Sequence, residues 1–139
     1  MARTYQQLRL ALASTLAVFL EPEEAQAESV RWFEEGLALS RAWLLANAAE
    51  SAPEALQPTL DAWVQRRRTG EPWAYILGWS LFRDRRFEVT RDTLIPRPET
   101  ELLVEAALDV GRRLQVDRCV DVGTGSGIIA ISLALETEW

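Results

Sequence analysis

The chain has 139 residues, of which 48% are hydrophobic, and this balance favours a folded protein with a packed core over a disordered one. It carries 15 basic and 21 acidic residues, and the resulting net charge of −6 argues against non-specific binding to nucleic acids. It contains no histidine, which excludes histidine-based acid–base catalysis, Ser-His and Cys-His nucleophiles, and the usual zinc sites.

The location in the cell is constrained by features that the sequence lacks. No hydrophobic run approaches the length of a membrane span, and residues 1–5 lack the hydrophobic segment of a signal peptide. A single cysteine, Cys119, rules out a disulfide within the chain, and its β-branched neighbours predict that it is buried in a strand. These features favour a cytoplasmic protein with one ordinary domain or two small ones.

The first half of the chain is predicted to be a small all-helical unit, because apolar residues recur there at helical spacing. The predicted helices cover residues 4–20, 23–36, 40–47 and 51–70. Thr4 and Ser40 are expected to cap two of them, and Gly36 and Gly70 are expected to end two others. Residues 1–65 by themselves indicate a packed helical core and no particular function.

Three successive arginines, Arg66 to Arg68, form the last turn of the fourth predicted helix. Positive side chains there interact favourably with the helix dipole. Alternatively, they could face an acidic or RNA-associated partner. Because successive helical residues point in different directions, the structural interpretation is favoured for at least some of the three.

A break at Gly70-Glu71-Pro72 precedes a short predicted helix at residues 73–77 and then a β-hairpin. The alternation of side chains places the two strands at residues 79–83 and 86–89, with the turn at Asp84-Arg85. The aromatic face of this hairpin needs to be covered, and we therefore place the hairpin as a linker between the two halves of the chain.

Two prolines, Pro96 and Pro98, hold the backbone around Arg97 extended and rigid, and a helix of about four turns is predicted to follow. Arg97 is close in sequence to Glu99 and Glu101, and these three charged residues could line the mouth of a pocket. Alternatively, the two acids only stabilise the N-terminus of the helix. The residues alone support both interpretations equally.

The most informative stretch is the loop Asp121-Val122-Gly123-Thr124-Gly125-Ser126-Gly127, between a predicted strand at residues 118–122 and a predicted helix at residues 128–135. A glycine loop between a strand and a helix offers main-chain N–H groups to an anionic ligand. The spacing excludes a dinucleotide fingerprint, whose third glycine would fall at Ile128, and a P-loop, which needs Gly-Lys-Ser/Thr. The pattern D-x-G-x-G-x-G resembles the first motif of class I S-adenosylmethionine-dependent methyltransferases.

That resemblance implies a set of cofactor-binding residues. They are Asp121, Gly123, Thr124, Gly125, Ser126 and Gly127. The carboxylate of the cofactor suits the helix N-terminus, and its ammonium and sulfonium groups suit a nearby carboxylate such as that of Asp121. The alternative is a glycine-rich turn without a ligand, which three alternating glycines after an acid make the less favoured interpretation.

Three segments taken together, residues 67–78, 94–101 and 121–127, resemble the HemK/PrmC family in order and spacing. This family consists of protein-glutamine methyltransferases that act on peptide chain release factors. The resemblance implies a helical N-terminal domain that helps to grip the protein substrate, a β-hairpin linker and a Rossmann-like α/β class I methyltransferase domain. The expected divisions are residues 1–78, 79–93 and 94–139, the last of these being an incomplete domain.

The reaction that the resemblance implies transfers a methyl group from S-adenosylmethionine to the side-chain amide nitrogen of a glutamine. That glutamine lies in the Gly-Gly-Gln motif of the release factor. A sister group modifies a ribosomal protein, but the Pro-Arg-Pro-Glu-Thr-Glu segment at residues 96–101 is more similar to the release-factor branch. The implied partner is therefore a release factor. The resemblance implies neither binding to a membrane nor direct specific binding to nucleic acid.

The catalytic signature of the family, Asn-Pro-Pro-Tyr, does not occur in this sequence, and no catalytic residue is assigned. In the family, the asparagine of that signature orients the substrate amide. We therefore expect the chain to be a truncated N-terminal piece, inactive by itself and with weak or no cofactor binding. The predicted strand at residues 118–122 would lack a parallel partner, and we therefore expect residues 115–139 either to pair with another copy of the chain or to pack differently from the intact enzyme.

Two other functions stay open. The chain could be a non-catalytic helical interaction module whose C-terminal part only helps it to fold or dimerise. It could also be a nucleic-acid amino-methyltransferase, which its acidic charge disfavours. The coding sequence after residue 139 would separate the enzyme from the module, because continuation into Asn-Pro-Pro-Tyr supports the enzyme and a stop codon supports the module.

Overall fold

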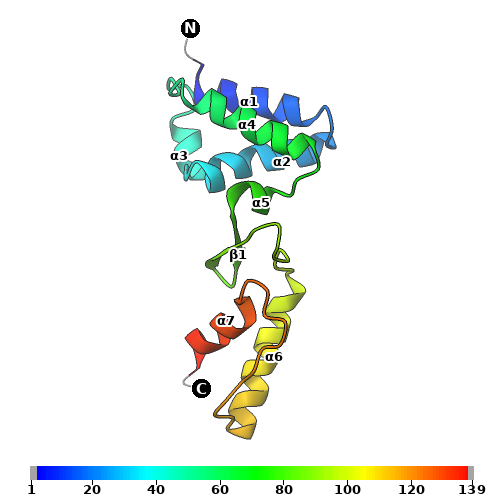
Figure 1. Ribbon diagram of the computed structural model, residues 1–139. Helices are drawn as coiled ribbons and strands as arrows, with labels where there is room; N and C mark the ends of the chain where they lie inside the picture. The colour runs from blue at the N-terminus through cyan, green and yellow to red at the C-terminus, as the bar shows by residue number, and fades with distance from the viewer. Residues whose placement is uncertain (1–2, 138–139) are drawn as a thin grey trace. The chain divides into compact units, whose positions relative to one another are not determined.

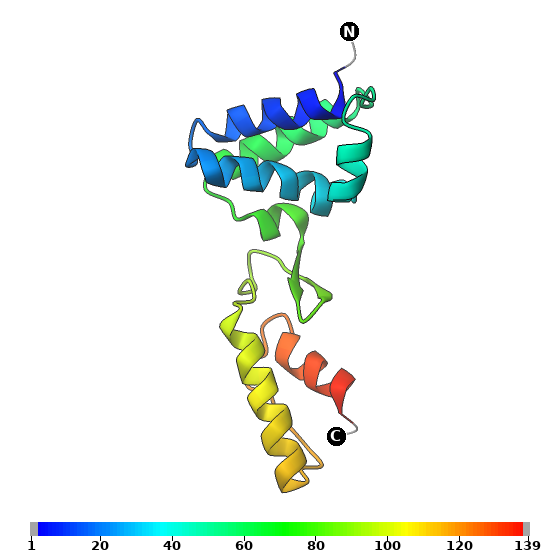
Figure 2. The same cartoon turned by 180° about the vertical axis from the view of Figure 1, so that it is seen from behind.

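The computed structural model describes residues 3–137, and the chain divides into two compact units, Met1–Ile76 and Leu77–Trp139. The first unit is built from helices, and the second combines a two-stranded antiparallel sheet with two helices (Figure 1, Figure 2). Among the residues that the structure describes, no helix is both long and apolar enough to cross a lipid bilayer.

The helices of the first unit largely confirm the sequence prediction. They are α1 (Tyr5–Leu16), α2 (Pro22–Arg31), the π-helix η1 (Trp32–Gly36), α3 (Arg41–Ala46), α4 (Leu56–Arg68) and α5 (Trp73–Leu77). Thr4 and Ser40 cap α1 and α3 as predicted. The Thr4 hydroxyl accepts a hydrogen bond from the Gln7 amide, and the Ser40 hydroxyl accepts one from the Trp43 amide.

Two helix boundaries in this unit differ from the prediction. The fourth helix begins at Leu56 rather than near Ser51, and α1 ends at Leu16 rather than at residue 20. Ser51 lies outside the helix because it forms an antiparallel bridge with Thr4 at the start of the chain, and a turn at residues 54–55 then leads into α4. Main-chain groups that are held in such a pairing are not available for a helical turn.

The core of the first unit contains three tryptophans that pack around Gly36. Trp32 stacks on Trp73 with ring centroids 4.7 Å apart, and Trp63 meets these two rings edge-on at 6.0 and 5.3 Å. A Cβ atom placed on Gly36 would lie 2.5 Å from Cη2 of Trp63, which is closer than real side chains approach. The residue that ends the second predicted helix is therefore also required for packing.

The second unit contains a hairpin and two helices. These elements are β1 (Trp79–Phe82), β2 (Arg85–Glu88), α6 (Glu99–Leu114) and α7 (Ile128–Glu136). The hairpin is confirmed, but its two-residue turn is Arg83-Asp84, one position earlier than predicted. Both turn residues have positive φ, 48° and 58°, as the favoured type I′ hairpin turn requires.

The register of the hairpin supplies aromatic side chains to the core of the second unit. Phe82 pairs with Arg85 and Ser80 pairs with Phe87, so the two phenylalanines lie on the same face of the sheet. Their buried cluster also contains Val104, Leu108, Ile128 and Leu133. The hairpin therefore shares one core with α6 and α7, and this core holds the first turn of α7 directly after the glycine loop.

The predicted strand at residues 118–122 is not formed. Residues 116–121 have no regular secondary structure, and Val120 and Val122 are 83% and 90% exposed. Cys119 was expected to be buried in that strand, and it is exposed as well. A parallel strand needs neighbouring strands for its main-chain groups, and the only sheet within residues 3–137 is the hairpin. The β-branched run thus has no strand to pair with in the described part of the chain.

Candidate functional site

The loop that leads into α7 is shaped by three glycines. Gly123, Gly125 and Gly127 have φ values of 79°, 57° and 77°, a region that residues with a side chain rarely adopt. The amide of Gly127 donates a hydrogen bond to the carbonyl of Thr124 at 2.8 Å, which closes a tight turn. No side chain lies within 4 Å of the position that a Cβ atom would take on Gly123 or Gly125. The main chain of the loop is therefore accessible to a ligand.

Asp121 places an acceptor without a partner at the start of this loop. Its Oδ2 atom is buried and has no hydrogen-bond partner among the described residues. A buried carboxylate oxygen without a partner is costly, and this one is therefore suited to a cationic group or a hydroxyl donor of a ligand. At the other end of the loop, Gly127 begins α7 without a side-chain cap, which leaves first-turn N–H groups for an anionic group.

The three charged residues predicted at a pocket mouth lie at the start of α6. Arg97 and Glu99 are exposed, and Glu101 accepts a hydrogen bond from the main-chain N–H of Arg83 at 2.9 Å. Glu99 and Glu101 also fall in the first turn of α6, where acids interact favourably with the helix dipole. Two cavities of about 750 and 410 Å³ lie in the first unit, and neither is lined by these residues. Their role at a pocket mouth stays a prediction.

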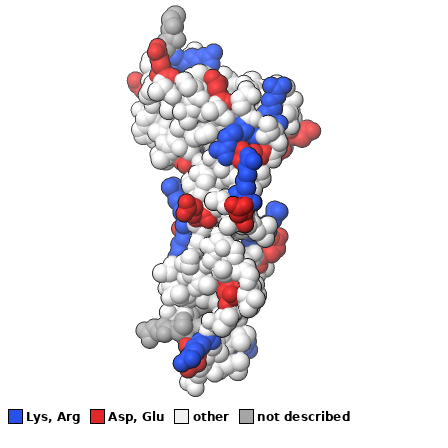
Figure 3. All heavy atoms as spheres, in the orientation of Figure 1, with Lys and Arg blue, Asp and Glu red and all other residues white. Residues whose placement is uncertain are grey.

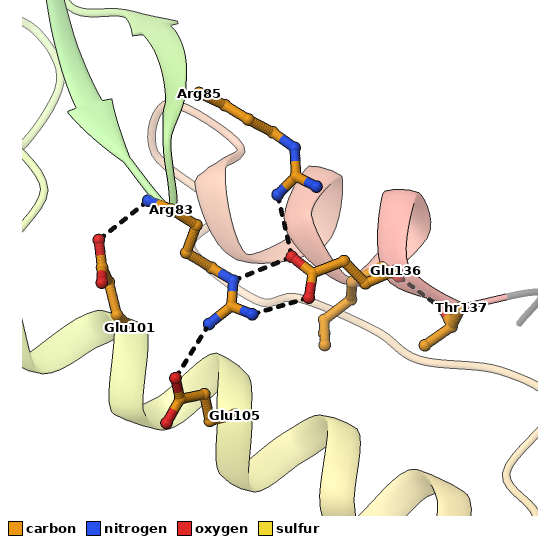
Figure 4. A network of polar contacts seen from close by, with 7 residues as sticks. Arg83, Arg85, Glu101, Glu105, Glu136 and Thr137 are labelled. Carbon is orange, nitrogen blue, oxygen red and sulfur yellow. Dashed lines mark hydrogen bonds and ion pairs between the residues drawn. The ribbon is translucent and has the colours of Figure 1, made fainter.

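A cluster of ion pairs joins the hairpin turn to the C-terminal end of α7 (Figure 4). The Arg83 guanidinium donates to both carboxylate oxygens of Glu136, at 2.9 and 2.7 Å, and Arg85 donates to the same carboxylate at 2.9 Å. Glu105 of α6 lies 3.5 Å from Arg83. Because α7 begins at the glycine loop, this clamp holds the helix whose N-terminus borders the candidate site. Sequence reasoning missed it, since the partners are 51 and 53 positions apart and no local pattern links them.

The two arginines keep Glu136 ionised. Hydrogen bonds from Arg83 and then from Arg85 lower the pKa of Glu136 from 4.5 to about 2. A carboxylate whose pKa is lower in the folded state contributes stability above its unfolded-state pKa and loses it as the pH falls through the folded-state pKa. The clamp is therefore complete at neutral pH, and its contribution is lost between pH 4.5 and about pH 2.

Glu136→Gln is expected to reduce the acid sensitivity of α7. In the unmodified chain, the protection of α7 amides against hydrogen exchange should fall as the pH is lowered from 4.5 to about 2, and the variant should change less. Glu105→Gln is the control, because this carboxylate is 63% exposed and makes one longer contact with Arg83. Equal acid sensitivity in the unmodified chain and in Glu136→Gln would show that the clamp does not stabilise α7.

Two of the three successive arginines are bound within the first unit. Arg66 forms a bidentate pair with Glu71 at 2.7 and 2.8 Å, and Arg67 binds Glu28 at 2.7 and 3.2 Å. Arg68 is exposed and has no partner within residues 3–137. On the face shown in Figure 3, basic and acidic side chains are interspersed. The arginine run is therefore mainly structural and does not form a basic tract for RNA.

Comparison with known proteins identifies similar sequences. The family model described as the PrmC N-terminal domain matches residues 10–78. A release factor glutamine methyltransferase of Bordetella pertussis is 43% identical over 115 residues, which cover 83% of this chain and 43% of that protein. Proteins of the same name from Neisseria gonorrhoeae and Haemophilus influenzae are 48% and 38% identical over 97 and 119 residues. These two matches cover 70% and 82% of this chain and 35% and 41% of the relatives, so the chain spans less than half the length of each.

Proposed function

Because this chain belongs to the PrmC/HemK family of release factor glutamine methyltransferases and matches the N-terminal part of its members, we propose that it forms the N-terminal portion of such an enzyme. The proposed reaction transfers a methyl group from S-adenosylmethionine to the side-chain amide of the glutamine in the Gly-Gly-Gln motif of a peptide chain release factor. The observation that carries this proposal is the glycine loop after Asp121, together with the family match of the preceding helices.

The residues of the loop fit S-adenosylmethionine. The unpartnered Oδ2 atom of Asp121 would accept hydrogen bonds from the ammonium or hydroxyl groups of the cofactor. Gly123 and Gly125 would let the main chain of the loop, which includes Thr124 and Ser126, approach the cofactor closely. The N-terminus of α7, directly after Gly127, would face the carboxylate of the cofactor. The cofactor, when bound, supplies an activated methyl group. The clamp of Arg83 and Glu136 would position the loop through α7.

We also propose a division of the chain by role. Residues 1–78 would grip the protein substrate, and residues 94–139 would begin an α/β class I methyltransferase domain. Residues 79–93 would link these two parts. The family match over residues 10–78 supports the first of these boundaries. Arg97, Glu99 and Glu101 would lie towards the mouth of the cofactor pocket. An enzyme that acts on release factors would work in the cytoplasm, where translation terminates.

The direct test is methyl transfer with and without the remainder of the enzyme. The 139-residue chain alone is expected to transfer no labelled methyl group to a purified release factor and to bind S-adenosylhomocysteine weakly or not at all. A chimera in which this chain replaces the matching segment of the Bordetella pertussis relative is expected to transfer the label. Turnover by the isolated chain, or micromolar binding of S-adenosylhomocysteine to it, would contradict the first expectation. A folded but inactive chimera would contradict the second.

The exposed segment at residues 118–122 favours a second candidate function, a non-catalytic interaction module. Val120 and Val122 are almost fully exposed, and the isolated chain would bury them by pairing this segment with a second copy. A dimer in light scattering would support that self-association, and a monomer would count against it. A ribosomal-protein glutamine methyltransferase is a further alternative, but the relatives are release factor glutamine methyltransferases, which favours a release factor as substrate.

A further inference from the structure

An open groove of about 750 Å³ lies on the first unit, lined by residues of α1, α2, η1 and α3. Part of its apolar lining comes from Val30 of α2 and from Leu44 and Leu45 of α3. Leu45 is 75% exposed, although a leucine side chain gains about 1.5–3 kcal/mol when it is buried. The groove therefore contains apolar surface that the described chain leaves in contact with water.

The helix that forms one wall of this groove is apolar but not buried. α3 consists of one arginine followed by Ala42-Trp43-Leu44-Leu45-Ala46, and no residue of this helix is buried. The helix is nevertheless held in place, because Trp43 packs edge-on against Tyr5 of α1 with ring centroids 4.9 Å apart. A fixed apolar helix without cover marks a surface for binding another protein.

The charged side chains of the groove favour an acidic partner. Arg31 and Arg41 line it and have no ion-pair or hydrogen-bond partner within residues 3–137, and Arg9 contacts only a side-chain amide at 3.4 Å. The lining also contains two glutamates: Glu34 has no partner within residues 3–137, and Glu35 accepts a hydrogen bond from the indole N–H of Trp73 at 2.7 Å. Three arginines against two glutamates leave the groove with a net positive charge, in a chain whose net charge is −6.

We propose that this groove binds an acidic, amphipathic helical segment of the protein substrate. Apolar side chains of that segment would pack on Leu44 and Leu45, and its carboxylates would pair with Arg31 and Arg41. Binding of an amphipathic helix in a groove uses apolar anchors along one stripe, while charged pairs at the rim speed the encounter and fix the register. The identity of the partner as a release factor rests on the proposed function, and the groove itself contributes affinity without taking part in the chemistry.

A matched pair of substitutions tests the apolar wall. Leu45→Asp is expected to weaken the binding of a purified release factor to this chain by about tenfold or more, measured by calorimetry. Val18→Asp is the control, because Val18 is 76% exposed, against 75% for Leu45, and does not line the groove. The control should bind within about twofold of the unmodified chain. Circular dichroism of both variants checks that the helices are retained.

A second pair tests the charges. Arg41→Glu is expected to weaken binding of the release factor by about tenfold at low salt and less at high salt. Arg68→Glu is the control, because Arg68 is also exposed and without a partner in the described chain, and it should have little effect.

If the release factor binds and both groove variants match their controls, the groove is not the docking surface and the proposed function stands. If the unmodified chain dimerises and Leu45→Asp abolishes the dimer, a second copy fills the groove and the inference is wrong. If the release factor does not bind to this chain at all, the inference about the groove is wrong. The proposed function is then tested separately, by methyl transfer with the chimera.

Discussion

Replacing Glu28 by alanine is expected to lower the free energy of unfolding of the helical unit by about 3 kcal/mol. Glu28 is 4% exposed, and its carboxylate accepts hydrogen bonds from the indole N–H of Trp32 at 3.1 Å and from Arg67 at 2.7 Å. The side chain of Arg67 is only 18% exposed. Alanine would therefore leave the buried N–H donor of Trp32 without a partner and a largely buried cation with only the longer, exposed contact to Glu24 at 3.7 Å, which costs more than the loss of a surface ion pair.

The control for this prediction is the second carboxylate near Arg67. Glu24 lies 3.7 Å from Arg67 and is 55% exposed, so Glu24→Ala should change the free energy of unfolding by less than about 0.5 kcal/mol. Glu28→Gln keeps an oxygen acceptor for Trp32, and its loss in free energy of unfolding should lie between those of the two alanine variants. Urea unfolding followed by tryptophan fluorescence gives all three values. Equal destabilisation by Glu28→Ala and Glu24→Ala would show that the buried network does not hold the unit together.

Replacing Gly125 by valine is expected to weaken cofactor binding by up to about 100-fold in the chimera with the Bordetella pertussis relative. The φ value of Gly125 is 57°, which a β-branched residue adopts only with strain, and the added side chain would project into the space beside the loop. The main-chain amides would then no longer reach the ligand. Calorimetry with S-adenosylhomocysteine measures the change in affinity.

The control for the loop separates strain from contact with the cofactor. Gly70 also has a positive φ, 85°, with no atom within 4 Å of a built Cβ, but it lies in the first unit after α4. Gly70→Val should impose a similar conformational cost on the chain and leave the affinity for S-adenosylhomocysteine within about twofold of the unmodified chimera. If both variants lose affinity equally, the effect is general destabilisation and the loop has no special role.

Local sequence signals were sufficient for the first unit because its helices are specified by short-range patterns. Capping by Thr4 and Ser40 involves residues only three positions away, and apolar spacing determines which face is buried. The alternating glycines likewise predicted a loop directly before the last helix, and the structure has one there. What it missed depends on distant segments, such as the bridge between Thr4 and Ser51 or the fit of Gly36 against a tryptophan of α4.

In the second unit, the errors come from residues whose partners no local pattern identifies. The hairpin turn falls at Arg83-Asp84, one residue earlier than predicted, and Arg83 adopts a left-handed conformation there that its residue type does not favour. Cys119 and Val120 have the composition of a buried strand, but the described chain offers no neighbouring strand. Local sequence also did not predict that Glu101 accepts a hydrogen bond from a main-chain amide of the hairpin, since the two residues are 18 positions apart.

The most direct test of the central claim is to observe the loop amides while the cofactor binds. In the chimera, labelled with ¹⁵N and titrated with S-adenosylhomocysteine, the amide resonances of Gly123, Gly125 and Gly127 are predicted to shift in proportion to occupancy. An Asp121→Ala chimera should need a higher concentration for the same shift, because it lacks the unpartnered acceptor. Saturating binding that leaves these three amides unmoved would contradict the assignment of this loop to a methyl donor.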